Sequence, residues 1–146
     1  MLARVSTSMI DVRYDAAPPR LHVALRGPVS GDQMVQTLSQ LYLDQPEVTR
    51  EDMLFDMREY QGSAEAVHIR QIAAAYLQSN RDPCRPCRTA FVTPDPNFRL
   101  WAASMSMLFA GREHRAFESW AEAEAFLDEP MRQRPAFVAS AALAKV

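Results

Sequence analysis

Two cysteines, Cys84 and Cys87, stand at the spacing C-x-x-C in the stretch RDPCRPCRTAFV. Such a pair can exchange disulfides or can supply half of a zinc site. In thioredoxin-type enzymes the pair follows a strand and begins a helix, whose dipole lowers the pKa of the first thiol. Here we expect the pair after a helix and before a strand, so a loop with two thiols is the preferred interpretation. A redox role stays open, because flanking arginines favour thiolates.

A zinc site needs about four ligands, and the cysteines supply only two. The nitrogen ligands would be His22, His68 and His114, which fall on three separate segments. With only four glycines and no P-loop, G-x-G-x-x-G or H-E-x-x-H motif, the chain has no recognisable cofactor loop or catalytic metal motif. We therefore expect no metal, no cofactor and no enzymatic activity.

Acidic side chains are frequent between residues 44 and 59, and most of them are expected on a solvated surface. Asp56 differs from the others, because it lies near the carboxyl end of a predicted central strand. Parallel sheets bind their ligands at that edge. Arg58, two residues further on, offers the simpler alternative of an ion pair with Asp56.

The segment FRLWAASMSMLFAG predicts a helix whose apolar residues extend beyond one face. Trp101, Met105, Leu108 and Phe109 recur at helical spacing and are expected to pack against a sheet. Two other uses stay open: the segment can form a dimer face, or one wall of a cavity for an apolar ligand.

Periodicity predicts the remaining elements. Alternating apolar residues predict strands over 8–15 and 20–27, and short apolar runs predict strands over 52–58, 88–93 and 113–119. Helical spacing predicts helices over 30–45, 63–80, 98–111 and 119–129. Ser63 and Ser119 are the expected N-caps of two of these helices. The inner side of helix 63–80 is expected to consist of Ala66, Ile69, Ala73, Tyr76 and Leu77.

Strands alternate with helices along the chain after an initial pair of strands. This order predicts an α/β fold with a mixed, mostly parallel sheet of about five strands, packed helices and an antiparallel N-terminal edge hairpin. Residues 1–130 are expected to form one domain. Residues 131–146 are expected to form a C-terminal tail, in which one more helix can begin after Pro135.

The net charge of the 146-residue chain is only −2, which does not favour nucleic acid or an anionic membrane as a partner. No run reaches the roughly 18 apolar residues that span a bilayer, and no signal-peptide pattern is visible. A cytoplasmic protein is expected.

Three stretches, LFDMREYQGSAEA, TAFVTPDPNF and HRAFESWAEAEAFL, resemble the SpoIIAA-like branch of the STAS superfamily of sulfate transporters and anti-sigma-factor antagonists. The resemblance covers roughly residues 8–128. Phe98-Arg99 stands where the family often has Tyr-Gly. The antagonists are phosphorylated in an Asp-Ser-Ser-Gly turn before the second helix, whereas the corresponding turn here, EYQGSAEA, keeps only Ser63.

This resemblance implies a bacterial, non-enzymatic regulatory domain that binds a protein partner of unknown identity. Ser63 could act as a phosphorylation switch, with Asp56 and Arg58 on the same rim, since a helix N-terminus favours a phosphate. Ser63 could equally be an N-cap only.

Related folds include lipid carriers, so the alternative is a carrier or sensor of a small apolar, lipid-like ligand beside Trp101, Met105, Leu108 and Phe109. That alternative predicts an enclosed cavity, whereas an interaction domain or homodimer predicts a filled core and an exposed apolar patch.

Overall fold

The structure, a computed structural model, describes residues 9–80 and 86–130. The order of elements is that predicted from the sequence, with one short 3-10 helix added. The elements are β1 (Met9–Ala16), β2 (Pro19–Gly27), α1 (Gly31–Asp44), η2 (Pro46–Arg50), β3 (Asp52–Tyr60), α2 (Ala66–Ser79), β4 (Cys87–Val92), α3 (Phe98–Met105), β5 (Arg112–Phe117) and α4 (Trp120–Asp128).

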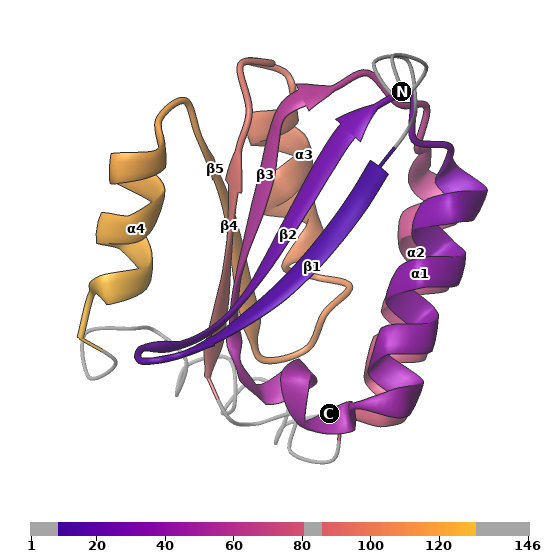
Figure 1. The fold of residues 1–146 in the computed structure, drawn as a ribbon, viewed down its shortest axis with the longest axis horizontal. Helices are drawn as coiled ribbons and strands as arrows, with labels where there is room; N and C mark the ends of the chain where they lie inside the picture. Colours follow the sequence, from indigo (N-terminus) through magenta and orange to yellow (C-terminus); the bar gives the residue numbers. More distant parts are fainter. Residues whose placement is uncertain (1–8, 81–85, 131–146) are drawn as a thin grey trace, which may run out of the picture.

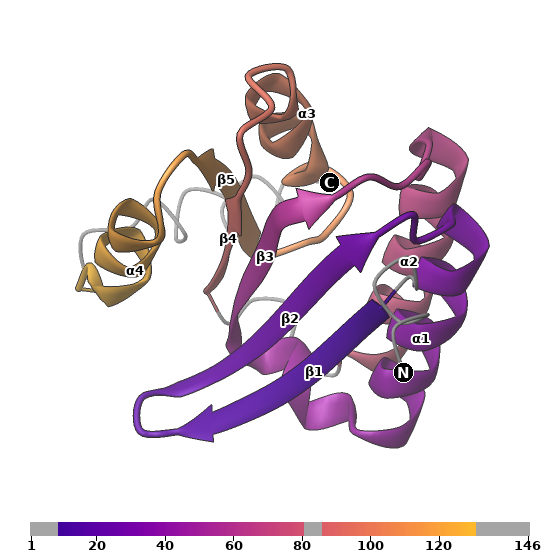
Figure 2. The same ribbon diagram turned by 45° about the horizontal axis from the view of Figure 1, so that its top comes forward.

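The described residues form one five-stranded sheet in the order β1-β2-β3-β4-β5. β1 pairs antiparallel with β2, and the other neighbours pair in parallel. Figures 1 and 2 show the hairpin of β1 and β2 at one edge and β5 at the other. The predicted mixed sheet with an N-terminal antiparallel hairpin is therefore confirmed.

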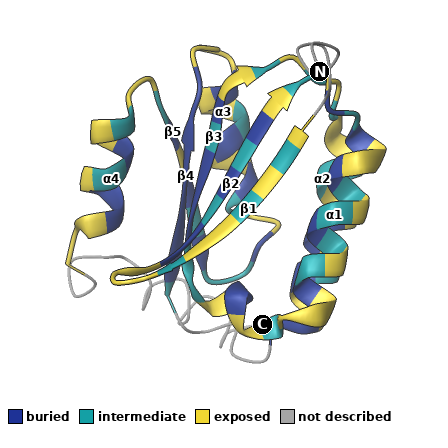
Figure 3. Cartoon of the chain, viewed as in Figure 1, coloured by how far each residue is buried: buried dark blue, intermediate teal, exposed yellow. Residues whose placement is uncertain are grey.

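Helices α1, α2 and α3 cover one face of the sheet, which we call the inner face. Alternation along the strands sends every second side chain to this face, as with Leu21, Val23 and Leu25 of β2, each only 1% exposed. The N-cap of α1 is Ser30, whose hydroxyl accepts from Gln33 N–H in a capping box. Figure 3 shows that β4 is buried along its whole length, as expected for a strand with a neighbour on each side.

Helix α4 covers β4 and β5 on the opposite face, which we call the outer face (Figure 1). Its N-cap is Ser119, as predicted, with the hydroxyl accepting from Glu122 N–H. At its other end the guanidinium of Arg88, from β4, donates to the carbonyls of Phe126 and Glu129. A cation at this position also complements the negative end of the helix dipole.

Three helix predictions need correction. Helix α2 begins at Ala66 with Glu65 as N-cap, so Ser63 lies before the cap and does not serve as one. The inner side of α2 uses Ile72, whereas Ala66 and Leu77, both predicted on that side, are exposed. Helix α3 ends at Met105, because the chain turns from Ser106 to Gly111 before β5.

The cysteine segment also differs from the prediction. Cys87 is the first residue of β4 and is buried, with its thiol 3.2 Å from the carbonyl oxygen of Arg50. Cys84 lies outside the described residues, as do residues 131–146 and the helix predicted there.

Candidate ligand-binding site

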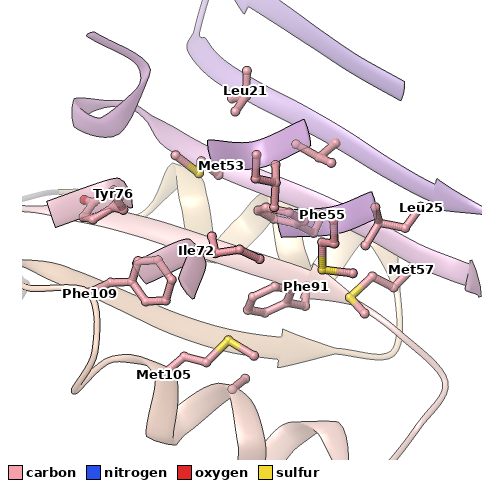
Figure 4. Close-up of a cluster of buried hydrophobic side chains, with 14 of the residues drawn as sticks. Leu21, Leu25, Met53, Phe55, Met57, Ile72, Tyr76, Phe91, Met105 and Phe109 are labelled. Atoms are coloured by element: carbon pink, nitrogen blue, oxygen red, sulfur yellow. The ribbon is translucent and has the colours of Figure 1, made fainter. Parts of the chain in front are cut away.

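A cavity of about 60 Å³ lies between the inner face of the sheet and helices α1, α2 and α3. Its walls are almost entirely apolar, and three of the four residues singled out in the predicted helix 98–111 line it: Trp101, Met105 and Phe109. Figure 4 shows Met105, Phe109 and Phe91 of β4 among the buried side chains on this side of the sheet. The fourth residue, Leu108, is 36% exposed and is not part of the wall.

The cavity adjoins a wider groove of about 630 Å³ at the carboxyl ends of β3 and β4. The two spaces share five lining residues: Met57, Tyr60, Ala64, Phe98 and Trp101. The groove continues over the β3–α2 and β4–α3 connections. This is the edge at which open parallel sheets bind ligands.

Polar side chains reach the cavity at the other end, where the parallel strands begin. Arg112 of β5 is 3% exposed and has no carboxylate partner among the described residues. Neutral oxygens satisfy its guanidinium instead: Nε donates to the Tyr76 hydroxyl at 3.1 Å, and Nη1 to the Thr89 hydroxyl at 3.1 Å. The remaining bonds go to the backbone carbonyls of Thr49, Glu51 and Arg88.

His114, two residues further along β5, also lines the cavity and is 6% exposed. Its ring lies against Phe109 and Phe91, with centroid separations of 4.9 Å and 5.9 Å. Burial, with the nearby charge of Arg112, lowers the pKa of His114 to about 3, so the imidazole is neutral at physiological pH.

The sequence did not identify Arg112 or His114 as residues that line a cavity, although His114 falls within the predicted strand over 113–119. The sequence signal that could have shown their burial is the alternation along β5, in which Arg112, His114 and Ala116 all point to the inner face. Phe117, the one apolar aromatic residue of this strand, packs instead with the cluster beneath α4.

Asp56 and Arg58 form a bidentate ion pair, in which Arg58 Nε and Nη2 each lie 2.9 Å from a carboxylate oxygen of Asp56. The hydrogen bonds from Arg58 hold the pKa of the Asp56 carboxyl below its usual range. The pair lines a shallow groove of about 240 Å³ on the outer face, where Arg58 lies 5.2 Å from the centre of the Trp120 ring. The simple ion pair, one of the two predicted alternatives, is thus formed.

Ser63 is exposed in the connection between β3 and α2, and its N–H donates to the carbonyl of Val29 at 3.4 Å. It precedes a helix of the inner face, whereas Asp56 and Arg58 line a groove on the outer face. The structure brings Asp56 and Arg58 together but does not bring Ser63 to them. A phosphorylation switch at Ser63 stays a prediction.

No group of three His, Cys, Asp or Glu side chains that could hold a metal ion occurs in residues 9–80 and 86–130. Over the same residues, no helix is both long enough and apolar enough to cross a membrane.

No protein-family model matches the chain, and no curated protein matches it in sequence. A solved structure does resemble it: that of an uncharacterised protein of the DUF3478 family with a SpoIIAA-like fold, from Shewanella loihica PV-4. The superposition has a TM-score of 0.54 and covers 82% of this chain and 93% of that one, with 15% sequence identity. At that identity the likeness establishes the architecture and nothing finer. The resemblance expected from the sequence is thus confirmed at the level of the fold: the chain has a SpoIIAA-like α/β fold.

Proposed function

We propose that this domain is a non-enzymatic binding module that holds a small apolar, lipid-like ligand between α3 and the sheet. One observation carries the proposal: the apolar cavity adjoins the groove at the carboxyl ends of β3 and β4. A ligand can thus reach buried apolar surface from outside without crossing the sheet. Apolar pockets with few polar groups are the usual form of small-molecule sites.

The volumes limit how such a ligand would bind. An engineered cavity of about 150 Å³ accepts benzene, and a single water needs only about 10–15 Å³. The cavity here has about 60 Å³, so it accommodates only a narrow part of a ligand, while the rest lies in the groove of about 630 Å³. Trp101 and Phe98 lie where the two spaces meet.

The protonation state of His114 supports binding rather than catalysis. A general base works best when its pKa lies near the operating pH, and the pKa of His114 is about 3. The cation at the cavity, Arg112, uses its guanidinium to hold neutral oxygens of η2, α2 and β4.

Fluorescence of Trp101 tests the proposal, because this side chain lines both spaces. The chain has two tryptophans, so Trp120→Phe leaves Trp101 as the only reporter. Titration with toluene is expected to change the emission saturably. Ala64→Leu, which narrows the junction, is expected to weaken binding at least tenfold, whereas Ala66→Leu on the exposed start of α2 leaves it unchanged. Absence of saturable binding, or equal affinity of Ala64→Leu, contradicts the proposal.

The second candidate is the regulatory protein-interaction role implied by the SpoIIAA-like fold, with a second copy of the chain as one partner. The exposed apolar side chains around α3 favour it: Leu100 is 79% exposed and Met107 is 88% exposed. Sedimentation of the wild type and of Leu100→Lys tests the homodimer. A dimer that the substitution dissociates supports it, and a monomer at all concentrations contradicts it.

A further inference from the structure

Strand β1 lies at the edge of the sheet, and in the described part of the chain it has a neighbouring strand on one side only (Figure 2). Soluble proteins usually protect such an edge with a proline, a bulge, a very short strand or a charged side chain that points into the core. β1 has eight residues, no proline and no bulge in its pairing with β2. Its inward side chains are apolar or aromatic: Ile10 and Val12 pack against the core, and Tyr14 follows on the same face by alternation.

The charged side chains of β1 lie on the outer face. Asp11 and Arg13 are exposed and line the groove of that face. Arg13 forms an ion pair within its own strand, with Nε 3.2 Å from a carboxylate oxygen of Asp15. Asp11 has no ion pair among the described residues. Two opposite charges thus stand two residues apart on an open edge strand, and an antiparallel strand with the same sequence presents them in the reverse order.

We propose that this edge binds a second copy of the chain, so that two β1 strands pair antiparallel across a two-fold axis and the two sheets become one. This interface uses a surface other than the exposed residues around α3, and it does not depend on ligand binding. A two-fold interface brings the same residues together twice, so the strand must be complementary to itself.

The side chains of β1 meet this condition in one register. Because alternate side chains lie on opposite faces, inner side chains pair with inner ones only if the two-fold axis passes through a residue. With Val12 on the axis, Asp11 of each copy lies opposite Arg13 of the other, which is a pair of opposite charges. On the inner face, Ile10 then lies opposite Tyr14, which pairs a β-branched residue with an aromatic one. Pairs of both kinds stabilise antiparallel strands.

The other registers are less favourable. With Arg13 on the axis, two guanidiniums face each other and Asp11 faces Asp15, and like charges in opposite positions destabilise a sheet. With Asp11 on the axis, two carboxylates face each other. With Tyr14 on the axis, the strands overlap over fewer residues, because the axis then lies close to the end of β1 at Ala16. Of these registers, only the first combines a long overlap with pairs of opposite charge.

Sedimentation of two charge-reversal variants tests this interface. Asp11→Arg places two arginines at the centre of the edge strand, and Arg13→Glu places two acidic residues there, so each variant faces itself with like charges. Each substitution is expected to raise the Kd of the dimer at least about tenfold. An equimolar mixture of the two variants restores opposite charges and is expected to form a heterodimer. The control is Arg70→Glu on the exposed side of α2, which is expected to leave the Kd unchanged.

The outcomes distinguish this dimer from one formed through α3. If both charge reversals leave a dimer intact and Leu100→Lys dissociates it, the contact lies at α3 and the inference is overturned. A monomer at every concentration, or two variants that stay monomeric when mixed, overturns it as well. The toluene titration gives its result independently of these outcomes.

Hydrogen exchange of the unsubstituted protein provides a second measurement, which does not depend on how the variants fold. Alternate N–H groups of β1 point away from β2, and in the dimer they donate to the second copy. Their exchange is expected to slow as the protein concentration rises, whereas exchange of the N–H groups bonded to β2 changes less. Exchange that is independent of concentration overturns the inference; if it is slow throughout, another part of the chain covers the edge.

Discussion

Arg112 and Tyr76 connect the last strand to the second helix: the guanidinium donates to the phenol oxygen at 3.1 Å and lies 5.3 Å from the centre of the ring. The same guanidinium also reaches η2 through the carbonyl of Thr49 at 2.9 Å. One buried cation therefore holds together η2, α2, β4 and β5 where the parallel strands begin.

Removing this cation is expected to destabilise the fold strongly. Arg112→Met leaves the carbonyls of Thr49, Glu51 and Arg88 without the donor they share, at a cost of about 3 kcal/mol or more. Arg112→Lys keeps the charge but has three donors on one nitrogen, so an intermediate loss is expected. Urea unfolding of the three proteins measures the differences. Wild-type stability of Arg112→Met would refute the structural role of the cation.

The pH dependence of stability should report the buried His114. Its pKa is about 3 in the folded protein, against about 6.5 in an unfolded chain. Below pH 6.5 the imidazole therefore binds a proton in the unfolded chain but not in the folded protein. As the pH falls, the free energy of unfolding decreases by up to about 1.4 kcal/mol per pH unit, until the pH approaches about 3. Urea midpoints between pH 6.5 and 4.5 are expected to fall less steeply in His114→Phe.

His22 provides the control for this experiment. Burial lowers its pKa too, but the carboxylate of Asp15, 3.0 Å from Nε2, opposes that effect. His22→Gln should therefore change the slope less than His114→Phe does. Identical slopes for the wild type and His114→Phe would mean that His114 is not buried as a neutral ring.

Two serines before helices should respond differently to removal of the hydroxyl. Ser119→Ala is expected to cost about 1 kcal/mol, because this hydroxyl accepts from Glu122 N–H at the start of α4. Ser63→Ala is expected to cost less than about 0.5 kcal/mol, because Ser63 is exposed and lies before the cap of α2. Thermal unfolding compares them, and a larger loss for Ser63→Ala would contradict the assigned start of α2.

Two glycines make a matched pair: Gly31 is the first residue of α1, and Gly62 lies in the connection between β3 and α2. A Cβ at Gly62 would collide with the backbone carbonyl of Val29 and the ring of Tyr60, whereas the nearest atoms to a Cβ at Gly31 belong to the ring of His68. A side chain can turn aside more easily than a backbone carbonyl. Gly62→Ala is therefore expected to cost roughly 1–3 kcal/mol, more than Gly31→Ala, in urea unfolding. Equal costs would argue against this close approach.

Much of the architecture was readable because it depends on local patterns. The alternation of Leu21, Val23 and Leu25 and the cap at Ser119 involve residues within a few positions of each other. Helix ends without such a signal were misplaced. Ser63 has the right residue type for a cap, but the chain stays extended as far as Glu65. Likewise no proline or glycine marks the end of α3 at Met105.

The sequence by itself determined the succession of strands and helices and the five-stranded mixed sheet. It also singled out Trp101, Met105 and Phe109, which line the cavity. Only the tertiary structure decided that Arg112 and His114 are buried. A buried cation such as Arg112 is stable only where oxygen atoms accept its hydrogen bonds. The oxygens of Thr49 and Tyr76 that do so lie 63 and 36 residues away in the sequence. Spacing along a strand gives the face on which a side chain lies, whereas the partners on that face depend on packing between segments far apart in sequence.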